Sequence, residues 1–159
     1  MTLMRYSVLM SVYNKEKAGF FRLSLKSMFE QTCPPEQVVV VCDGPLTKGL
    51  NEVLKYFQIK YPEILTIHRL RENRGTGYAA NEGLKLCRNE LIAKMDSDDI
   101  SYADRCEKQL AKFAKNPFLD MLGGYVSEFE GDVSNEKAIK KVPITNEEIL
   151  QYAKRRNPF

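Results

Sequence analysis

A run of four valines excludes most of the folds that a chain of this length could adopt. Residues 37–42 read QVVVVC, a segment without polar residues at alternate positions. A strand with one face in water would alternate between apolar and polar side chains, whereas a strand of a parallel sheet is buried on both faces. The run therefore predicts a parallel sheet within an α/β fold.

Apolar segments and helical segments alternate along the rest of the chain. Strands are expected at 6–13, 37–42, 65–70, 91–95 and 121–129, and helices at 20–31, 50–60, 78–87 and 103–115. Parallel strands need crossover connections, which helices provide and which are nearly always right-handed. The order βαβαβαβαβ predicts a Rossmann-like, mostly parallel central sheet flanked by helices. A capping-box pattern, TNEE at 145–148, predicts one more short helix that ends near Arg155.

The bulk properties are those of a globular protein with one ordinary core. The chain has 159 residues, and its apolar stretches are far shorter than the roughly 20 residues that span a bilayer. Residues 1–5 lack the layout of a signal peptide, so we expect a cytoplasmic protein. The net charge of +3 is too small to indicate a nucleic-acid-binding protein.

The cysteines and the single histidine offer no site of their own. Cys33, Cys42, Cys87 and Cys106 form no C-x-x-C pair, and His68 is the only histidine, so the spacing of a zinc site is absent. We expect reduced, mostly buried thiols. His68 falls inside a predicted strand, which favours a structural role over a catalytic one.

Three polar segments directly follow predicted strands. They are Asn14–Glu16, Asp43-Gly44 and Asp96–Asp99. In open α/β sheets, ligands bind at the carboxyl ends of the strands. These three segments are therefore the candidates for a binding site.

The acidic segment DSDD, residues 96–99, is the most specific of the three. Carboxylates packed together need a cation or hydrogen-bond donors to stay charged, and hard divalent ions prefer carboxylate and phosphate oxygens. A diphosphate leaving group needs such neutralisation, because its negative charge grows as the bond to it breaks. The alternative is an acidic turn that caps a helix beginning near Ser101 or Ala103, although a cap needs only one carboxylate.

Two further features are each open to two interpretations. Asp43 can be part of a simple Asp-Gly turn, or its carboxylate can accept the ring N–H of a uracil or hold a ribose. The loop Arg71–Gly77 before a helix can be a phosphate-binding turn or a flexible connection. It matches neither the dinucleotide-binding nor the Walker pattern.

Taken together, five segments in register resemble glycosyltransferase family 2, of the GT-A fold. The segments are Ser7–Asn14 (SVLMSVYN), Leu25–Thr32 (LKSMFEQT), Val38–Gly44 (VVVVCDG), Asn73–Gly75 with Ala79–Gly83, and Met95–Ile100 (MDSDDI) with Asp104-Arg105. The resemblance covers about residues 5–130. A single match of this kind would be weak, but five in the family's order are specific.

The resemblance implies a role for each matched position. Val12, Tyr13 and Asn14 would contact the base, Gly75 and Asn81 would shape its pocket, and Asp43 would bind the uracil edge. Arg71 or Arg74 would approach the diphosphate, and Asp96 would bind the ribose. Asp98 and Asp99 would hold Mn²⁺ or Mg²⁺. The sequence departs from the family at Cys42, where a second aspartate is usual. The family's general base normally lies beyond this stretch, and the resemblance assigns it to none of Glu128, Glu130 and Asp132.

The activity that the resemblance implies is sugar transfer with inversion. The donor would be a nucleotide diphosphate sugar, with a UDP-sugar as first choice, and the acceptor a hydroxyl of a glycan or of a lipid-linked sugar. Such enzymes build surface polysaccharides, which implies peripheral association with the inner membrane face. Residues 1–130 are expected to form the nucleotide-sugar-binding domain, and 131–159 to begin the acceptor-side region of a truncated chain.

Two alternatives remain open. The chain can be a nucleotide-binding fragment without turnover, because the acceptor-side half is largely missing. It can also be a phosphatase of the haloacid dehalogenase type, with Asp96 as nucleophile and Asp98 as its partner. That class carries its motif after the first strand and follows it with Thr or Val, whereas here the fourth strand leads into it and Asp99-Ile100 follows.

Overall fold

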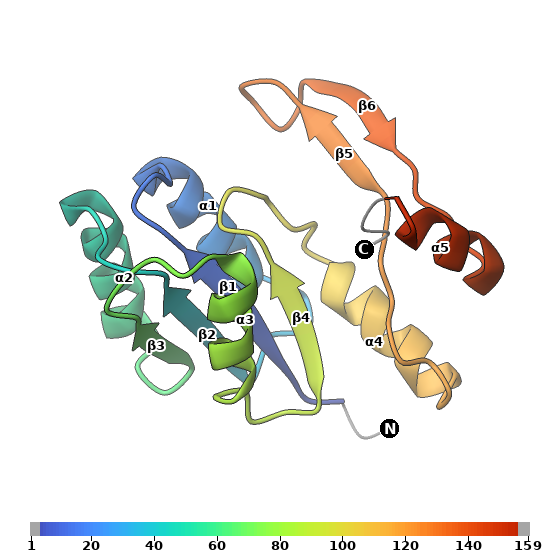
Figure 1. Cartoon of the computed structure of the whole chain (residues 1–159), viewed down its shortest axis with the longest axis horizontal. Coiled ribbons are helices and arrows are strands. Elements are labelled where there is room, and N and C mark those ends of the chain that lie inside the picture. The colour runs from blue at the N-terminus through green and yellow to red at the C-terminus, as the bar shows by residue number, and fades with distance from the viewer. Residues whose placement is uncertain (1–3, 156–159) are drawn as a thin grey trace. The chain divides into compact units, whose positions relative to one another are not determined.

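The computed structural model describes residues 4–155 and divides into two compact units, one up to Lys115 and one from Asn116 onwards (Figure 1). Residues 1–3, which belong to the segment examined for a signal peptide, and residues 156–159, which end the expected acceptor-side region, lie outside this range. The first unit holds β1 (Tyr6–Val12), α1 (Ala18–Phe29), β2 (Gln37–Cys42), α2 (Lys48–Lys60), β3 (Leu65–Arg69), α3 (Thr76–Leu84), β4 (Leu91–Met95) and α4 (Arg105–Lys115).

The four strands of the first unit form one parallel sheet in the order β3-β2-β1-β4. In the register of this sheet, Val12 is paired with Cys42 and Met10 with Met95. The carboxyl ends of β1, β2 and β4 therefore lie along one edge. The structure confirms the α/β class and the parallel sheet that the valine run predicts.

Both faces of β2 are covered, and all six of its residues are buried. Val38 and Val40 pack in the larger core, to which α1 contributes Phe21 and Leu25 and α2 contributes residues such as Leu50. Val39 and Val41 pack in a smaller core with Leu9 of β1 and Ala79 of α3. In Figure 1, α1 and α2 accordingly lie on one side of the sheet and α3 on the other. This two-sided burial is why the strand cannot alternate with polar residues.

Helix α3 approaches the sheet closely through Gly83. A Cβ atom at this position would lie 2.3 Å from Cδ1 of Leu9 and 2.8 Å from Cγ2 of Val41. Both distances are shorter than any contact between packed carbon atoms. The absence of a side chain at Gly83 therefore sets how near α3 lies to β1 and β2.

The second unit holds β5 (Val126–Phe129), β6 (Glu136–Lys140) and α5 (Asn146–Ala153). The strand expected at 121–129 is confirmed only for Val126–Phe129, and its expected place in the parallel order is wrong, because it pairs antiparallel with β6. The reason is the turn-forming segment Gly131–Asn135, in which Gly131 has a positive φ. A short hairpin closes a smaller loop than a crossover does and costs less chain entropy.

The short helix predicted after residue 145 is confirmed as α5. The Thr145 side chain accepts from the Glu148 N–H, and the Glu148 side chain accepts from the Thr145 N–H, which together make the capping box. Between residues 4 and 155, none of the helices is long and apolar enough to cross a membrane.

Candidate functional site

The three polar segments predicted from the sequence meet at the carboxyl edge of the sheet. Because Val12 is paired with Cys42, Tyr13 and Asp43 follow neighbouring strands side by side. Met95 is paired with Met10, so Asp96 leaves the sheet next to the last residues of β1. The edge thus gathers segments that are up to about 80 residues apart in the sequence.

Asp43 holds the loop between β3 and α3. Its Oδ1 accepts a hydrogen bond from the Arg74 N–H at 2.7 Å, and its Oδ2 accepts one from the Gly75 N–H at 3.0 Å. The Asn73 side-chain amide donates to the Asp43 carbonyl at 3.3 Å. The Asp43 residue is only 5% exposed. We call this set of contacts the Asp43 clamp.

Gly44 makes the Asp43 clamp sterically possible. Its φ is +87°, and a Cβ atom there would lie 2.7 Å from the Asn73 nitrogen. An L side chain would be strained by the backbone conformation and would collide with the loop. The Asp-Gly pair is therefore a turn, as one interpretation held, and it also carries a buried carboxylate. Each carboxylate oxygen keeps a further lone pair for a ligand.

The loop of residues 71–77 is not a free phosphate-binding turn. Two of its amides, those of Arg74 and Gly75, already donate to Asp43. Its charged side chains remain available, since Arg71 and Arg74 are both exposed. The Arg74 guanidinium lies over the ring of Tyr78, 4.0 Å from its centroid.

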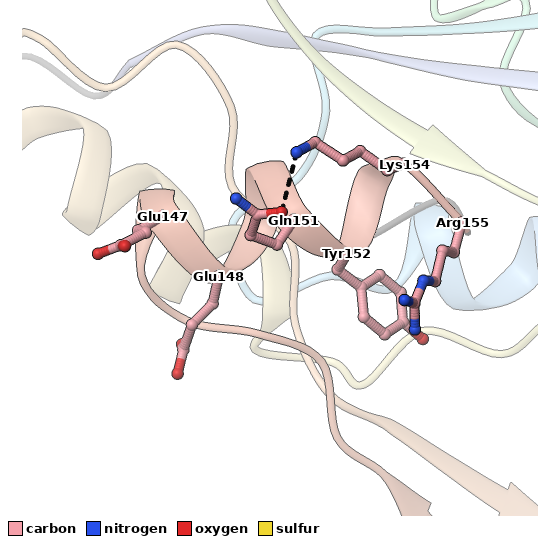
Figure 2. Close-up of a pocket in the computed structure, with 6 residues that line it drawn as sticks. All are labelled: Glu147, Glu148, Gln151, Tyr152, Lys154 and Arg155. Carbon is pink, nitrogen blue, oxygen red and sulfur yellow. Dashed lines mark hydrogen bonds between the residues drawn. The ribbon is translucent and has the colours of Figure 1, made fainter.

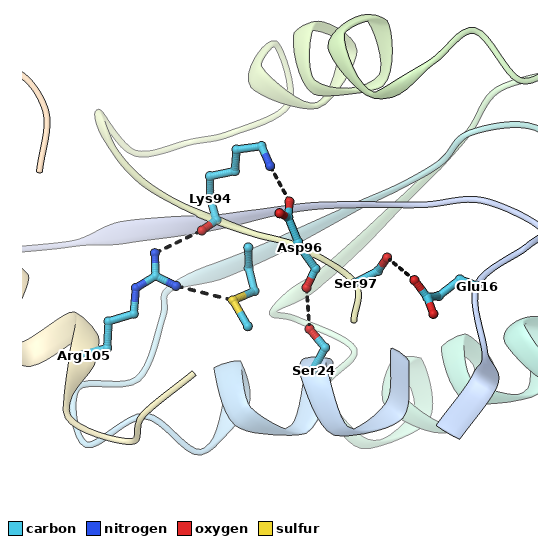
Figure 3. A network of polar contacts seen from close by, with 7 residues as sticks. Glu16, Ser24, Lys94, Asp96, Ser97 and Arg105 are labelled. Carbon is cyan, nitrogen blue, oxygen red and sulfur yellow. Dashed lines mark hydrogen bonds and ion pairs between the residues drawn. The ribbon is translucent and has the colours of Figure 1, made fainter. Parts of the chain in front are cut away.

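The acidic segment is not a set of three equivalent carboxylates, and Figure 3 shows the contacts made by Asp96. Asp96 already has a cation, because the Lys94 ammonium lies 2.6 Å from its Oδ1. Its carbonyl accepts from the Ser24 hydroxyl of α1 at 2.7 Å. The buried Ser97 donates to the Glu16 carboxylate at 3.0 Å and so joins this segment to the one that follows β1. Two carboxylates, Asp98 and Asp99, are left without such a partner among the contacts of the described residues.

Asp98 and Asp99 form the part of the segment that fits a divalent cation. Both residues are exposed at the protein surface. Partial desolvation of its carboxyl group, followed by the charges of Asp98 and Asp96, raises the pKa of Asp99. Such mutual repulsion is what a bound cation relieves. Within residues 4–155, no three His, Cys, Asp or Glu side chains converge on one metal position. Mg²⁺-like ions commonly use one or two protein carboxylates together with substrate phosphates.

The helix-capping alternative for the acidic segment is wrong. Helix α4 begins at Arg105, several residues after Asp99. In its first turn, the Cys106 N–H donates to the side chain of Gln31, 3.0 Å away. The carboxylates of the segment are therefore not used by the helix.

The remaining candidates differ in accessibility. Val12 is 1% exposed and belongs to the core, and its carbonyl accepts from the Asp43 N–H at 2.8 Å, so it offers little surface to a ligand. Tyr13, Asn14 and Asn81 are exposed and lie after β1 or on α3. The structure places His68 inside β3, as expected.

The cysteines match their predicted state. All four are free, and three of them, Cys33, Cys42 and Cys106, are buried, while Cys87 is partly exposed. Burial raises the pKa of the Cys42 thiol to about 11.

The second unit shows no gathering of predicted site residues. A surface hollow lies along α5 and is lined by Glu147, Glu148, Gln151, Tyr152, Lys154 and Arg155, residues of mixed charge from one helix and its end (Figure 2). Among the acidic residues considered for the general base, Glu130 pairs with Lys137 at 3.4 Å and Asp132 accepts from Ser134. These two residues stabilise the hairpin, and the base remains unassigned.

Residues that the sequence reasoning missed connect the acidic segment to the rest of the domain. They are Ser24, Ser27, Gln31, Lys94 and Arg105. One signal was available for Lys94, because residues two apart on a strand point to the same face. The contacts of Gln31 span about 70 residues of sequence and leave no such local signal.

A comparison with models of protein families matches residues 7–159 to the one described as glycosyl transferase family 2. The chain belongs to glycosyltransferase family 2. This membership agrees with the five sequence segments and with the site at the carboxyl edge. It sets aside the phosphatase alternative, whose motif would follow the first strand rather than β4.

Curated glycosyltransferases from several bacteria are similar to this chain over almost its whole length. An uncharacterised glycosyltransferase of Haemophilus influenzae is 39% identical over 98% of this chain and 58% of its own length. The amylovoran biosynthesis glycosyltransferase AmsE of Erwinia amylovora is 37% identical, over 97% and 56%. The UDP-Gal:alpha-D-GlcNAc-diphosphoundecaprenol beta-1,3-galactosyltransferase of Escherichia coli is also 37% identical, over 98% and 55%. The chain therefore spans little more than half the length of these relatives.

Solved structures of glycosyltransferases share the fold. The mannosyltransferase PcManGT from Pyrobaculum calidifontis, in complex with GDP-Man and Mn²⁺, superposes with a TM-score of 0.61 at 26% identity, over 71% of this chain and 33% of that chain. TarS of S. aureus in complex with UDP-GlcNAc gives a TM-score of 0.59 at 28% identity, over 70% and 32%. These neighbours confirm the GT-A fold expected from the sequence.

Proposed function

We propose that the whole protein transfers a sugar from a nucleotide diphosphate donor, with a UDP-sugar as first choice, to an acceptor hydroxyl with inversion. The observation that carries this proposal is that the Asp43 clamp and the segment with Asp98 and Asp99 follow strands ending at one sheet edge of a family 2 member. The name of the Escherichia coli relative specifies a UDP-Gal donor and a lipid-linked acceptor, and that of the Erwinia relative a polysaccharide. Both names support a role in surface polysaccharide synthesis on a glycan or lipid-linked acceptor. The proposal adds peripheral association with the inner membrane face.

In this proposal, Asp98 and Asp99 hold Mn²⁺ or Mg²⁺. The ion supplies positive charge that stabilises the diphosphate as its bond to the sugar breaks. Asp98 and Asp99 fit such an ion, because exposed carboxylates are hard oxygen ligands. The negative charge of Asp98 helps to raise the pKa of Asp99, and a bound cation would relieve that repulsion. The Mn²⁺ in the complex of the Pyrobaculum neighbour with GDP-Man supports the choice of ion.

The other site residues would bind and orient the nucleotide. Asp96 would hold the ribose, and the exposed Arg71 or Arg74 would approach the diphosphate. Asp43 would bind the uracil edge. The base pocket around Asp43 would be lined by Val12, Tyr13, Asn14, Gly75 and Asn81. Asp43 can serve both the loop and the base, because its two oxygens accept only one hydrogen bond each from the loop. The nucleotide-sugar domain would extend to about residue 130, with the acceptor-side region beginning at 131.

A thermal-shift titration with UDP, with and without Mn²⁺, tests the metal site. A ligand at about 100 times its Kd adds roughly 2.7 kcal/mol of stability, which such a measurement detects readily. We expect the double substitution Asp98→Ala with Asp99→Ala to abolish the part of the shift that needs Mn²⁺. Glu63→Ala is the control, because Glu63 is an exposed carboxylate before β3, at the opposite edge of the sheet. An unchanged Mn²⁺-dependent shift in the double variant would contradict the metal assignment.

A second candidate is nucleotide binding without turnover by the 159-residue chain alone. Its support is that the chain spans 55–58% of the relatives named above and that no described residue is assigned as general base. Binding of UDP with Mn²⁺ but no sugar transfer by this chain, together with transfer by a version of the relatives' full length, would establish it. Transfer by the 159-residue chain itself would exclude it.

A further inference from the structure

One row of polar side chains, on α1 and just after its end, lies against the acidic segment and the residues that follow it. Ser24 and Ser27 lie three residues apart on one face of α1, and Gln31, two residues after the helix ends, donates to the Ser27 carbonyl. Ser24 is 0% exposed and Gln31 is 4% exposed, although the neighbouring buried residues of α1 are apolar. We call these three residues the polar seam.

Each end of the acidic segment is fastened to the polar seam. At the start, the Ser24 hydroxyl donates to the Asp96 carbonyl at 2.7 Å, as Figure 3 shows. Two residues past the far end, the Ser101 N–H donates to the Ser27 hydroxyl oxygen at 3.0 Å. The Ser27 hydroxyl in turn donates to the Ser24 carbonyl at 2.7 Å, which fixes its orientation.

Gln31 extends this attachment to the beginning of α4. Its Nε2 donates to the Tyr102 carbonyl at 2.8 Å, to the Ser27 carbonyl at 2.9 Å and to the Ser101 hydroxyl at 3.3 Å. Its Oε1 accepts from the Cys106 N–H at 3.0 Å. The buried side-chain amide of Gln31 therefore connects α1, the residues that follow Asp99, and the first turn of α4.

The polar seam holds the backbone of the acidic segment without neutralising its carboxylates. All its contacts are made with carbonyls, N–H groups and a hydroxyl, so the oxygens of Asp98 and Asp99 stay free for a cation. Mg²⁺-like ions demand a nearly ideal ligand geometry, and removal of groups that orient metal ligands typically weakens metal binding about 10- to 100-fold. Without these contacts, the backbone of the acidic segment would adopt many conformations, and the two carboxylates would seldom have the arrangement that the ion requires.

We propose that Ser24, Ser27 and Gln31 are positioning residues, which hold Asp98 and Asp99 in the arrangement that binds the divalent cation and, through it, the diphosphate of the donor. This inference rests on the proposed function. It adds to the proposed metal ligands, Asp98 and Asp99, a set of residues on and just after α1 that hold the backbone around them.

The chain contains a matched control for each residue type. Gln37 is 3% exposed and also makes several buried hydrogen bonds, accepting from the Ser7 hydroxyl and the Arg88 N–H and donating to the Leu86 carbonyl. It is the first residue of β2, so it lies at the amino edge of the sheet, away from the site. Ser7, which is 0% exposed, is the corresponding control for the serines.

The test is the affinity for Mn²⁺ in the presence of saturating UDP, measured by calorimetry well below each variant's Tm, with Tm recorded separately. We expect Ser27→Ala and Gln31→Ala to raise the Kd for Mn²⁺ by about 10- to 100-fold and Ser27→Thr, which keeps the hydroxyl, to restore it. Ser7→Ala and Gln37→Ala should lower Tm while leaving that Kd unchanged. Ser24→Ala provides a milder variant in case Gln31→Ala does not fold.

Two results would overturn the inference. In one, the polar-seam variants lose stability but keep the wild-type Kd for Mn²⁺, as a merely structural role requires. In the other, the control variants weaken Mn²⁺ binding as much as the polar-seam variants do. A wild-type chain that binds no Mn²⁺ with UDP would instead overturn the proposed function, and the inference with it.

Discussion

Asp43 is a buried carboxylate whose partners are two main-chain amides of a loop that follows a different strand. It lies at a position that the sequence leaves open between a turn and a uracil contact. The structure shows that the turn and the carboxylate are parts of one arrangement, in which Gly44 allows the close approach and Asp43 supplies the acceptors. At this scale, one residue determines where a whole loop runs.

Asp43→Asn should therefore destabilise the protein before any ligand is considered. The new NH₂ group would face one of the two loop N–H groups, and a buried donor left without an acceptor costs about 1–3 kcal/mol. Urea denaturation of the variant and the wild type measures the loss. Asp132→Asn is the comparison, because the exposed Asp132 also accepts two hydrogen bonds, both from Ser134, in a surface turn. An equal loss in the two variants would contradict the special role of the Asp43 clamp.

The four thiols should differ in reactivity. Burial raises the pKa of all four, and that of Cys42 to about 11, so at about pH 8 its reactive thiolate is scarce. We expect iodoacetamide to label the partly exposed Cys87 first and Cys42 last, as peptide mass spectrometry would show. Rapid labelling of Cys42 in the native protein would contradict its burial.

The raised pKa of Cys42 also makes the stability of the protein depend on pH. The folded state favours the neutral Cys42 thiol, so its contribution to stability is complete below the ordinary pKa of about 9 and is lost as the pH rises through about 11. Between these pH values, we expect the free energy of unfolding of the wild type to fall relative to that of Cys42→Ala. Parallel pH profiles for the two proteins would show that the shift is absent.

At the scale of the element, close packing of α3 on the sheet gives a prediction with an internal control. Gly83→Ala puts a methyl group against Leu9 and Val41, and such overpacking typically costs about 1–3 kcal/mol. Gly77→Ala in the same helix meets nothing within 4 Å and should stabilise it, by up to about 1 kcal/mol, through helix propensity. Thermal unfolding of the two variants should therefore shift in opposite directions. A stabilising Gly83→Ala would show that α3 lies farther from the sheet.

The sequence predicts those elements whose pattern is local. The strands at 37–42 and 91–95 are predicted with their observed bounds, since a short apolar run ending in polar residues marks both ends. Helix α3 begins at Thr76, two residues earlier than expected, because Gly75 is fixed by a contact to the distant Asp43. The strand expected at 121–129 is predicted with too early a start and the wrong pairing. Its pairing depends on the turn after Phe129, and the apolar pattern of a strand does not reveal its partner.

The site shows the same division between local and distant information. The acidic segment and Asp43 stand out in the sequence because each follows a strand and is chemically distinctive. Their partners do not stand out, since Gln31 is an ordinary polar residue near a helix end until the fold brings residues 101–106 to it. Sequence reasoning therefore identifies groups that can bind a ligand more readily than groups that hold them in place.

At the scale of the whole molecule, the two units differ in how much of their surface is buried. All six residues of β2 are buried, whereas all five residues of β6 are exposed and α5 buries none of its eight. Backbone hydrogen bonds beneath a packed core open only with global unfolding, while those of a poorly covered unit open locally.

Hydrogen exchange followed by mass spectrometry should separate the units. We expect peptides from β1 and β2 to exchange most slowly and those from β6 and α5 to exchange orders of magnitude faster, because the latter have few buried contacts. Adding UDP with Mn²⁺ should slow exchange further in the acidic segment and the loop after β3. Equal protection of β2 and β6 in the free protein would indicate that the second unit is covered by other surfaces.

The Asp43 clamp grips the loop after β3 by its main chain, and this makes the loop a suitable place for directed evolution. The amides that Asp43 accepts from exist whatever side chains, other than proline, are attached at those positions. Arg71, Glu72 and Arg74 are all exposed, so a combinatorial library at these three codons would vary the side chains of a loop that we propose to lie near the donor, while the scaffold stays intact. Altered sugar or nucleotide preference could then be selected with little loss of folded protein.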